Sequence, residues 1–323
     1  MKTKSPAVSL CSSPVAGQME SRSDKEMRNI IIVAGAANGI GRSTCGKLAL
    51  AGDKVYAAMR ETKGRNAHRV QEIEAFARKH GVDLRTIEFD VSSQDSTNSA
   101  IETIIAENGR LDVVVHNAAQ IVYGPAEAFT SEQLAELYDT NVLSTQRVNR
   151  AALPHLRKQG QGLLVWISSS SARGGTSPYL GLYASSKAGL DALALSYAGE
   201  LARWGIETTI VVPGALGPGH YIRSGRPRDT IRAEEYADGP TADISEVALK
   251  GLAYLSPRDP DPEGVASAIA KVVAMPFGQR PLRIHFDPDD DGAAAVDGVA
   301  DRARAELLRR IGLADLLKPV VIR

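Results

Sequence analysis

The chain has 323 residues with 38 basic and 38 acidic side chains, so its formal net charge is zero. A neutral molecule has no overall field that attracts nucleic acid or an anionic membrane, and we expect neither as a partner. Its hydrophobic content of 43% allows a large core, and its length suits one α/β sheet with an extension.

Cys11 and Cys45 form neither a disulfide framework nor a metal-ligand pattern, and the six histidines show no paired spacing, so we expect no metal. No apolar run is long enough to span a bilayer. The stretch Ala7–Cys11 is too short and too rich in serine for a secretory signal, which favours a cytoplasmic location. Serine, proline and scattered charges predict a mobile tail over residues 1–27.

From Asn29 onward, short apolar runs alternate with helical patterns of 12 or more residues. This alternation predicts βαβ units and a single domain over residues 28–290, an α/β doubly wound parallel sheet of about seven strands with helices on both faces. The predicted strands are Ile30–Val33, Lys54–Met59, Leu84–Phe89, Leu111–Val115, Leu163–Ile167, Ile206–Val212 and Pro281–Phe286.

A seven-residue turn follows the first predicted strand directly: Gly35-Ala36-Ala37-Asn38-Gly39-Ile40-Gly41. Glycines at such a place let backbone amides approach a pyrophosphate at the N-terminus of the next helix. Since the turn stands between a buried strand and a helix, we interpret it as a dinucleotide site rather than an ordinary turn.

A long helix is predicted from about Ser131 to Arg157. Asn141 lies inside it, and because asparagine is a poor residue for a helix interior, its amide is expected to have a role.

A second helix, from Tyr183 to Arg203, begins with Tyr183-Ala184-Ser185-Ser186-Lys187. Residues four apart share a helix face, with roughly 5–6 Å between their Cβ atoms. An ammonium so close favours the phenolate, so we expect the pKa of Tyr183 to fall below about 10. Such a phenol gives a proton to a carbonyl oxygen or takes one from an alcohol. Taken alone, the spacing also fits an exposed helix pair.

The C-terminal third departs from this regular alternation. Residues 214–264 are rich in Pro, Gly, Arg and Asp, which predicts a long irregular insertion, either a lid over the substrate site or a disordered segment. A C-terminal helical extension is expected over residues 291–323, with its helix from about Ala300 to Leu317. Asp297 and Asp301 would then lie near the positive end of that helix dipole.

Together these motifs resemble the short-chain dehydrogenase/reductase family, from the first strand to about Gly214, which implies a Rossmann-like fold. Asp90-Val91 matches the pair beside the adenine, His116-Asn117-Ala118-Ala119 resembles the family's Asn-Asn-Ala-Gly, and Pro213-Gly214 matches the turn beside the nicotinamide. The chain departs from the family at Ala34 and Pro218, where threonine is usual, and at His116 and Ala119.

The resemblance implies four catalytic side chains: Asn141, Ser169, Tyr183 and Lys187. Aligning on the fifth strand selects Ser169, whereas counting back from Tyr183 gives Ser170, and we choose Ser169. In the family the tyrosine protonates the carbonyl oxygen, the lysine lowers its pKa and bonds the nicotinamide ribose, and the serine orients the carbonyl. The asparagine bends its helix and holds a relay water.

For the cofactor, the resemblance and the turn chemistry together imply a set of binding residues: Gly35, Asn38, Gly39, Ile40, Gly41, Arg60, Asp90, Val91, Asn117, Ala118, Tyr183, Lys187, Pro213 and Gly214. The second strand ends without a carboxylate and is followed by Arg60, whose guanidinium suits a ribose 2′-phosphate. We therefore favour NADP(H) over NAD(H), the alternative being that Arg60 is a solvated surface residue.

The predicted function is oxidoreduction between a carbonyl and a secondary alcohol on a small to medium apolar molecule, with reduction the expected direction. Residues expected to border the substrate are Ile121, Val122, Tyr123, Tyr179, His220 and Tyr221. Three loop arginines, Arg223, Arg226 and Arg228, hold an anionic group or form a solvated face.

By resemblance, the helices bearing Asn141 and Tyr183 pair with their copies in a homodimer or homotetramer. Two alternative functions stay open: a catalytically silent NADP(H)-binding sensor, which would normally have lost the tyrosine or lysine, and a sugar-nucleotide epimerase or dehydratase, which typically has a larger substrate domain.

Overall fold

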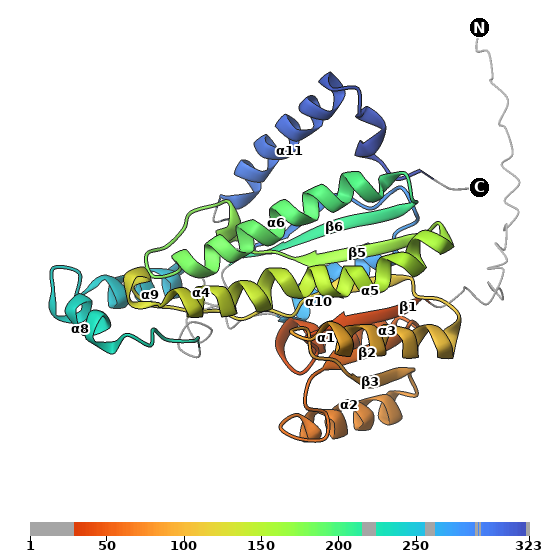
Figure 1. The fold of residues 1–323 in the computed structure, drawn as a ribbon, viewed down its shortest axis with the longest axis horizontal. Helices are drawn as coiled ribbons and strands as arrows, with labels where there is room; N and C mark the ends of the chain where they lie inside the picture. Colours follow the sequence, from red (N-terminus) through yellow and green to blue (C-terminus); the bar gives the residue numbers. More distant parts are fainter. Residues whose placement is uncertain (1–28, 215–223, 256–261, 288–289, 291, 321–323) are drawn as a thin grey trace, which may run out of the picture.

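The computed structural model describes residues 29–320 apart from 215–223, 256–261, 288–289 and 291 (Figure 1). The expected N-terminal tail and the expected substrate neighbours His220, Tyr221 and Arg223 therefore lie outside the described residues. Within the described part of the chain, no helix is both long and apolar enough to cross a membrane.

Seven parallel strands form one sheet in the order β3-β2-β1-β4-β5-β6-β7, which confirms the predicted fold class. Strands β1, β2, β4, β5 and β6 are almost entirely buried, as expected for apolar runs in a sheet covered on both faces. Their bounds are Ile30–Ala34 (β1), Lys54–Met59 (β2), Leu84–Glu88 (β3), Val113–His116 (β4), Gly162–Ile167 (β5), Ile206–Pro213 (β6) and Arg283–Phe286 (β7).

Helices cover both faces of the sheet and make two separate cores. Figure 1 shows α5 and α6 running along one face, where together with α3 they pack on the strands. The other face carries α1, α2 and α10. The bounds are Gly39–Leu50 (α1), Ala67–His80 (α2), Gln94–Asn108 (α3), Ser144–Gln159 (α5), Gly181–Ala202 (α6) and Pro262–Ala274 (α10).

The single long helix predicted before β5 is divided into three parts. Helix α4 covers Ser131–Tyr138, a π-helical turn covers Asp139–Leu143, and α5 follows. Because a π-turn inserts an extra residue into the helix, it displaces the side chains on either side and is frequent at functional sites. Asn141 lies in the middle of this turn and is fully buried.

The prediction of an irregular segment between residues 214 and 264 is wrong for the part that the structure describes. Helices α8 (Thr230–Asp238) and α9 (Ile244–Leu255) form there, and Figure 1 shows them beside α4 at one end of the molecule. The Asp229 side chain caps α8 by accepting from the Arg232 N–H at 3.0 Å. Two short helices between proline and glycine clusters do not change an average composition, which is why the sequence pattern missed them.

The C-terminal helix α11 covers Ala293–Arg310 and is followed by a 3₁₀ turn over Ala314–Leu317. It begins earlier than the predicted Ala300, after Gly292 in a left-handed conformation (φ 85°). Asp297 and Asp301 therefore lie in its second and third turns, where the helix dipole acts weakly, and the expected dipole role is wrong. Both carboxylates instead bind side chains of β7.

Candidate active site

The strand order reverses between β1 and β4, so the chain leaves the carboxyl ends of these strands in opposite directions. Ligands of open α/β sheets bind in the crevice that forms at such a reversal. The predicted cofactor residues Gly35 to Gly41 follow β1, and Asn117 and Ala118 follow β4, so the topology brings both segments to this crevice.

The glycine turn and the segment after β4 are in direct contact. A Cβ on Gly35 would lie 2.7 Å from the Ala118 Cα, and one on Gly41 would lie 2.4 Å from the Asn117 Nδ2. The same Asn117 amide donates to the carbonyls of Ala34 and Gly35 at 3.1 and 3.0 Å. These contacts explain why Gly35 and Gly41 cannot be other residues, and they give Asn117 a clear task of bracing the turn.

The N-terminus of α1 is open to a ligand. Its cap residue Asn38 makes no side-chain capping bond, and both Asn38 and Gly39 are exposed. A Cβ on Gly39 would meet nothing within 4 Å. Unpaired N–H groups and the positive end of the helix dipole bind anions, so these residues fit the pyrophosphate of a dinucleotide.

Asp90 and Val91 lie in a short turn after β3. The Asp90 Oδ1 accepts from the Ser92 N–H at 3.0 Å, and its own N–H donates to the Ser96 Oγ at 2.9 Å. Val91 packs against the core beneath α5. The turn therefore holds both residues at the carboxyl edge of the sheet, on the β1–β3 side of the crevice.

Arg60 follows β2 directly and its side chain is 55% exposed. The structure also places two carboxylates near it that the strand-end pattern did not consider. The Arg60 Nε lies 3.8 Å from the Glu61 Oε1, and Glu88 at the end of β3 accepts from the N–H groups of Glu61 and Thr62 at 2.7 and 2.8 Å. Arg60 is thus an available cation in a loop that also contains acids.

The tyrosine–lysine pair lies on the first two turns of α6. Lys187 is 3% exposed, its Nζ donates to the Ile167 carbonyl at 2.7 Å, and it lies 5.9 Å from the centre of the Tyr183 ring. Burial lowers the pKa of Lys187 from its ordinary value of 10.5 to about 8. The pair is therefore not the exposed surface pair that the spacing alone allowed.

Asn141 ties three segments together. Its Nδ2 donates to the Gln120 carbonyl and to the Ser186 Oγ, both at 2.9 Å, while its Oδ1 accepts from the Gln120 N–H at 2.7 Å. Ser186 stands just before Lys187 on α6. The Asn141 amide thus locks the π-turn to the loop after β4 and to the helix that carries the tyrosine and the lysine.

The four serines after β5 have different environments. Ser168 is buried and donates to the Asp191 Oδ1 at 3.1 Å, and Ser170 is buried at the start of a 3₁₀ turn. Ser169 is half-buried, with its Oγ 2.7 Å from the Ser171 Oγ. Ser171 is therefore a partner of the chosen serine that sequence reasoning did not single out.

Pro213 ends β6, and Gly214 continues the pairing with β7 by donating to the Phe286 carbonyl at 2.9 Å. A Cβ on Gly214 would lie 2.2 Å from the Asp287 Oδ1, so any larger residue would displace the Asp287 carboxylate. Pro218, expected near the carboxamide, lies outside the described residues.

Apolar side chains surround Tyr183 on two sides, in clusters that include the expected Ile121, Val122, Tyr123 and Tyr179. Tyr123 is fully buried and makes an edge contact with Tyr179, whose ring centre lies 5.8 Å away. Leu249 of α9 joins the same cluster, a neighbour that the sequence pattern missed because α9 was not predicted.

Two of the loop arginines are engaged within the protein. Arg226 lies over the Tyr123 ring, 5.6 Å from its centre, and Arg228 binds both oxygens of Glu136 at 2.9 and 2.6 Å. Both are exposed, which agrees with the solvated face and not with a preformed anion site.

A family model described as short chain dehydrogenase matches residues 29–223, more than half of the chain. The protein therefore belongs to the short-chain dehydrogenase family. As a member it is an oxidoreductase that uses a nicotinamide cofactor and acts on a small molecule.

Two curated relatives cover most of the chain. The 3-ketodihydrosphingosine reductase of Bacteroides thetaiotaomicron is 29% identical over 248 residues, which are 76% of this chain and 83% of that protein. The NADPH-dependent 3-dehydrocapnine reductase of Ornithobacterium rhinotracheale is 28% identical over 231 residues, 68% of this chain and 78% of that protein. A solved short-chain dehydrogenase from Streptomyces avermitilis superposes with a TM-score of 0.69 at 24% identity, covering 90% and 98% of the two chains, and shows the same fold.

Proposed function

We propose that the protein is an NADP(H)-dependent reductase of an apolar ketone or aldehyde, with Tyr183 as general acid/base. The observation that carries this proposal is the buried Lys187, which lies one turn after Tyr183 and is held by the end of β5. Burying an ammonium costs free energy, so its presence beside a tyrosine at the crevice is better explained by chemistry than by stability.

In this proposal a bound nicotinamide supplies the hydride that reduces the carbonyl carbon. Tyr183 donates its proton to the carbonyl oxygen, and the Lys187 ammonium stabilises the phenolate that results. Ser169 donates a hydrogen bond that orients the carbonyl oxygen. Asn141 holds α6 against the π-turn through Ser186, and its helix turn is where we place the water that returns a proton to Tyr183.

Two features support NADP(H) as the cofactor. Arg60 is an exposed guanidinium directly after β2, where a ribose 2′-phosphate would lie, and planar guanidinium groups bind phosphate through two bonds. The relative from Ornithobacterium is named as NADPH-dependent. Glu61 beside Arg60 is the feature that argues for NAD(H), because a carboxylate accepts from a free 2′-hydroxyl.

The apolar clusters beside Tyr183 favour a substrate with aliphatic or aromatic character. The Bacteroides relative is named for a 3-keto compound, which agrees with a ketone as the reducible group. Since Arg226 and Arg228 are engaged within the protein, we do not assign a charged group to this part of the substrate.

We also propose a homodimer or homotetramer formed through α5 and α6. The structure shows that Leu193, Leu195 and Tyr197 pack partly against the subunit's own core, so fewer apolar positions remain for a partner than the sequence pattern suggested. Light scattering of the purified protein measures the assembly directly.

The deciding experiment follows oxidation of NADPH and of NADH against aliphatic, aromatic, steroid and β-ketoacyl carbonyls. We expect turnover with NADPH that falls by a factor of roughly 10²–10⁴ in Tyr183→Phe while cofactor affinity is kept. Tyr236→Phe is the matched control, since this hydroxyl on α8 donates to the exposed Glu127 at 3.0 Å. Tight NADPH binding without turnover on any carbonyl would favour the silent sensor instead.

A further inference from the structure

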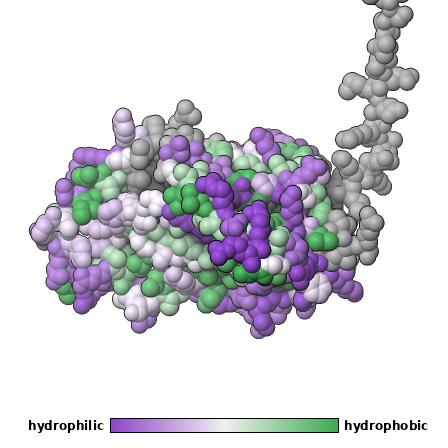
Figure 2. Space-filling model, turned by 90° about the horizontal axis from the view of Figure 1, so that it is seen from above, coloured by the Kyte–Doolittle hydropathy of each residue, from purple (hydrophilic) through white to green (hydrophobic). Residues whose placement is uncertain are grey.

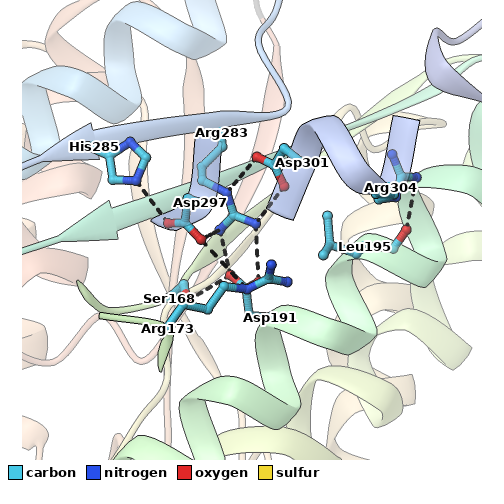
Figure 3. Close-up of polar contacts among 9 residues, drawn as sticks. All are labelled: Ser168, Arg173, Asp191, Leu195, Arg283, His285, Asp297, Asp301 and Arg304. Carbon is cyan, nitrogen blue, oxygen red and sulfur yellow. Dashed lines mark hydrogen bonds and ion pairs between the residues drawn. The ribbon is translucent and has the colours of Figure 1, made fainter. Parts of the chain in front are cut away.

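Six ionisable side chains form a largely buried cluster between β5, α6, β7 and α11, here called the α11 anchor (Figure 3). Its centre is Arg283, with a side chain only 4% exposed, and Asp191 and Asp297 are almost fully buried as well. The members are Arg173, Asp191, Arg283, His285, Asp297 and Asp301. None of them belongs to the active-site set described above.

Asp191 holds both ends of the turn that carries Ser169. Its Oδ1 accepts from the Ser168 Oγ at 3.1 Å, and its Oδ2 lies 2.8 Å from the Arg173 guanidinium. Asp191 follows Lys187 by one helical turn on α6. A single carboxylate therefore fixes the serine turn relative to the helix that presents Tyr183 and Lys187.

Helix α11 completes the partners of Arg283. The guanidinium donates to Asp191 at 2.7 and 3.2 Å on one side and to Asp301 of α11 at 3.0 and 3.3 Å on the other. Asp297, one turn earlier on α11, accepts from His285 at 2.9 Å. Because an unpaired buried charge is costly, Arg283 keeps its position against Asp191 only while its remaining N–H groups are also bonded.

Helix α11 also contacts the serine turn directly. A Cβ on Gly174, which closes the turn by donating to the Ser170 carbonyl at 2.9 Å, would lie 3.2 Å from the Ala293 Cβ at the start of α11. Figure 2 shows hydrophilic and hydrophobic residues mixed over the face seen from above, and the exposed side chains of α11 are of both kinds, with Arg302 and Arg309 beside Val299 and Leu307. The helix thus lies between solvent on one side and the active-site turn on the other.

The far end of the C-terminal segment has a separate attachment. Arg203 binds Asp315 at 2.7 Å, and the Val320 N–H donates to the Ala202 carbonyl at 2.9 Å, both at the opposite end of α6 from Tyr183. Between these two attachments Figure 1 shows α11 rising away from α6, and the Arg304 side chain reaches back to the Leu195 carbonyl of α6 at 3.2 Å (Figure 3). The distal attachment therefore serves as an internal control, since it holds the same segment without touching the serine turn.

We propose that Asp191, Arg283 and Asp301 are positioning residues through which α11 holds the Ser169 turn in register with Tyr183. The proposal rests on the proposed function for its effect on turnover. It assigns α11, which lies beyond the part of the chain matched by the family model, a task in the reaction. These residues act through Ser168 and Arg173 and touch no reacting atom.

The test compares Asp301→Ala with Asp315→Ala, the same substitution at the two attachments. The first readout is amide hydrogen exchange of a peptide spanning the serine turn, where the N–H groups of Ala172 and Gly174 are bonded within the turn. We expect exchange there to be roughly tenfold faster in Asp301→Ala and unchanged in Asp315→Ala. Asp301 is the preferred site because its side chain is 24% exposed, so the variant is expected to fold.

The second readout is steady-state kinetics. In Asp301→Ala we expect kcat to fall by roughly tenfold, since small displacements of a positioning group have large effects on rate. The NADPH dissociation constant should stay within about twofold, since α11 is remote from the glycine turn. Asp191→Asn, which releases Arg173 and Arg283 together, should lower kcat further. If α11 had a purely structural role, both Ala variants would lose thermal stability. Asp301→Ala would then show no fall in kcat that is distinct from a change in NADPH binding.

The two proposals fail in different ways. Turnover that is lost in Tyr183→Phe but unchanged in Asp301→Ala, with unchanged exchange in the turn, overturns the positioning role and leaves the reductase function intact. If no carbonyl is reduced by the unaltered protein, the reductase proposal fails, and hydrogen exchange still decides the positioning role. Faster exchange confined to the turn in Asp301→Ala supports that role, and equal exchange in both variants overturns it.

Discussion

Among the described residues, the buried polar side chains divide unevenly between the two sides of the point where the strand order reverses. On the β1–β3 side they are Thr44 and Thr97, both neutral. On the β4–β7 side they include Lys187, Asp191, Glu207 and Asp297, each ionisable. Each of the two apolar cores, one on either face of the sheet, extends across both sides of this point, so the difference does not come from a lack of apolar packing on one side.

Under the proposed function, the difference follows from what each side would bind or do. A pyrophosphate is bound by backbone N–H groups, and this requires glycines and a helix N-terminus but no buried charge. Proton transfer requires ionisable side chains in a dry place, and each of these needs a partner to offset its desolvation. The Glu207–Arg280 pair and the α11 anchor show how many such partners the β4–β7 side contains.

The largest effect is expected at Lys187, where a substitution should lower activity without lowering stability. Lys187→Met should lower kcat by roughly a hundredfold or more. At pH 7 the free energy of unfolding should equal or exceed that of the unaltered protein, because the cost of burying the ammonium is removed. This is measured by kinetics and by chemical denaturation.

The difference in the free energy of unfolding between the unaltered protein and Lys187→Met should depend on pH in a defined direction. The pKa of Lys187 is about 8 in the folded protein and 10.5 ordinarily, so the native state releases its proton first. The unaltered protein should therefore gain stability relative to Lys187→Met as pH rises from 8 toward 10.5, and below pH 8 the difference should be constant. A constant difference across the whole range would contradict this account of Lys187.

The next prediction tests the β1–β3 side, where backbone N–H groups are proposed to bind the cofactor. Gly41→Ala places a Cβ 2.4 Å from the Asn117 Nδ2 and 2.5 Å from the Gly35 carbonyl oxygen, so we expect a loss of roughly 2–3 kcal/mol in stability and much weaker cofactor binding. Gly39→Ala is the matched control for stability, because open space surrounds that position and only its φ of 53° is unfavourable, at about 1 kcal/mol. Calorimetry compares the stability of the two variants, and equal losses of stability would contradict the role of close packing, while NADPH titration measures the loss of binding in Gly41→Ala.

A smaller effect is expected at Arg60. Arg60→Ala should weaken NADPH binding by roughly tenfold, the loss of one charge-assisted interaction, while NADH binding changes less than about twofold. Arg65→Ala is the control, since Arg65 is an exposed arginine of the same loop that also pairs with Glu61. Equal weakening of both cofactors would remove the basis for NADP(H) preference.

The smallest effect concerns His116, where the family usually has asparagine. Burial lowers the pKa of His116 to about 4, although its bond to Asn149 opposes the shift. Since this pKa lies below its ordinary value of 6.5, the protein should lose stability as pH falls from 6.5 toward 4. His116→Asn should flatten that part of the stability profile, measured by thermal unfolding, and an unchanged slope would contradict the assignment.

Several features of the site were accessible to sequence reasoning because they depend on neighbours in the chain. The strand β2 was predicted with its observed bounds, Lys54–Met59, because a buried parallel strand is a continuous apolar run between turn signals. Asn141 was notable as a poor helix former, and the structure places it in a π-turn. The glycine turn was readable because a strand, a tight turn and a helix follow one another directly.

What the sequence alone determined is therefore the parallel sheet, the glycine turn and the tyrosine–lysine pair, all of which follow from short-range spacing. Only the tertiary structure decided that Lys187 is buried, that Ser168 and Ser169 have different partners, and that α11 reaches the serine turn. The bond from Arg283 to Asp191 joins residues 92 positions apart. Such partners are chosen by desolvation cost and geometry in the folded protein, and neither quantity is encoded in local periodicity.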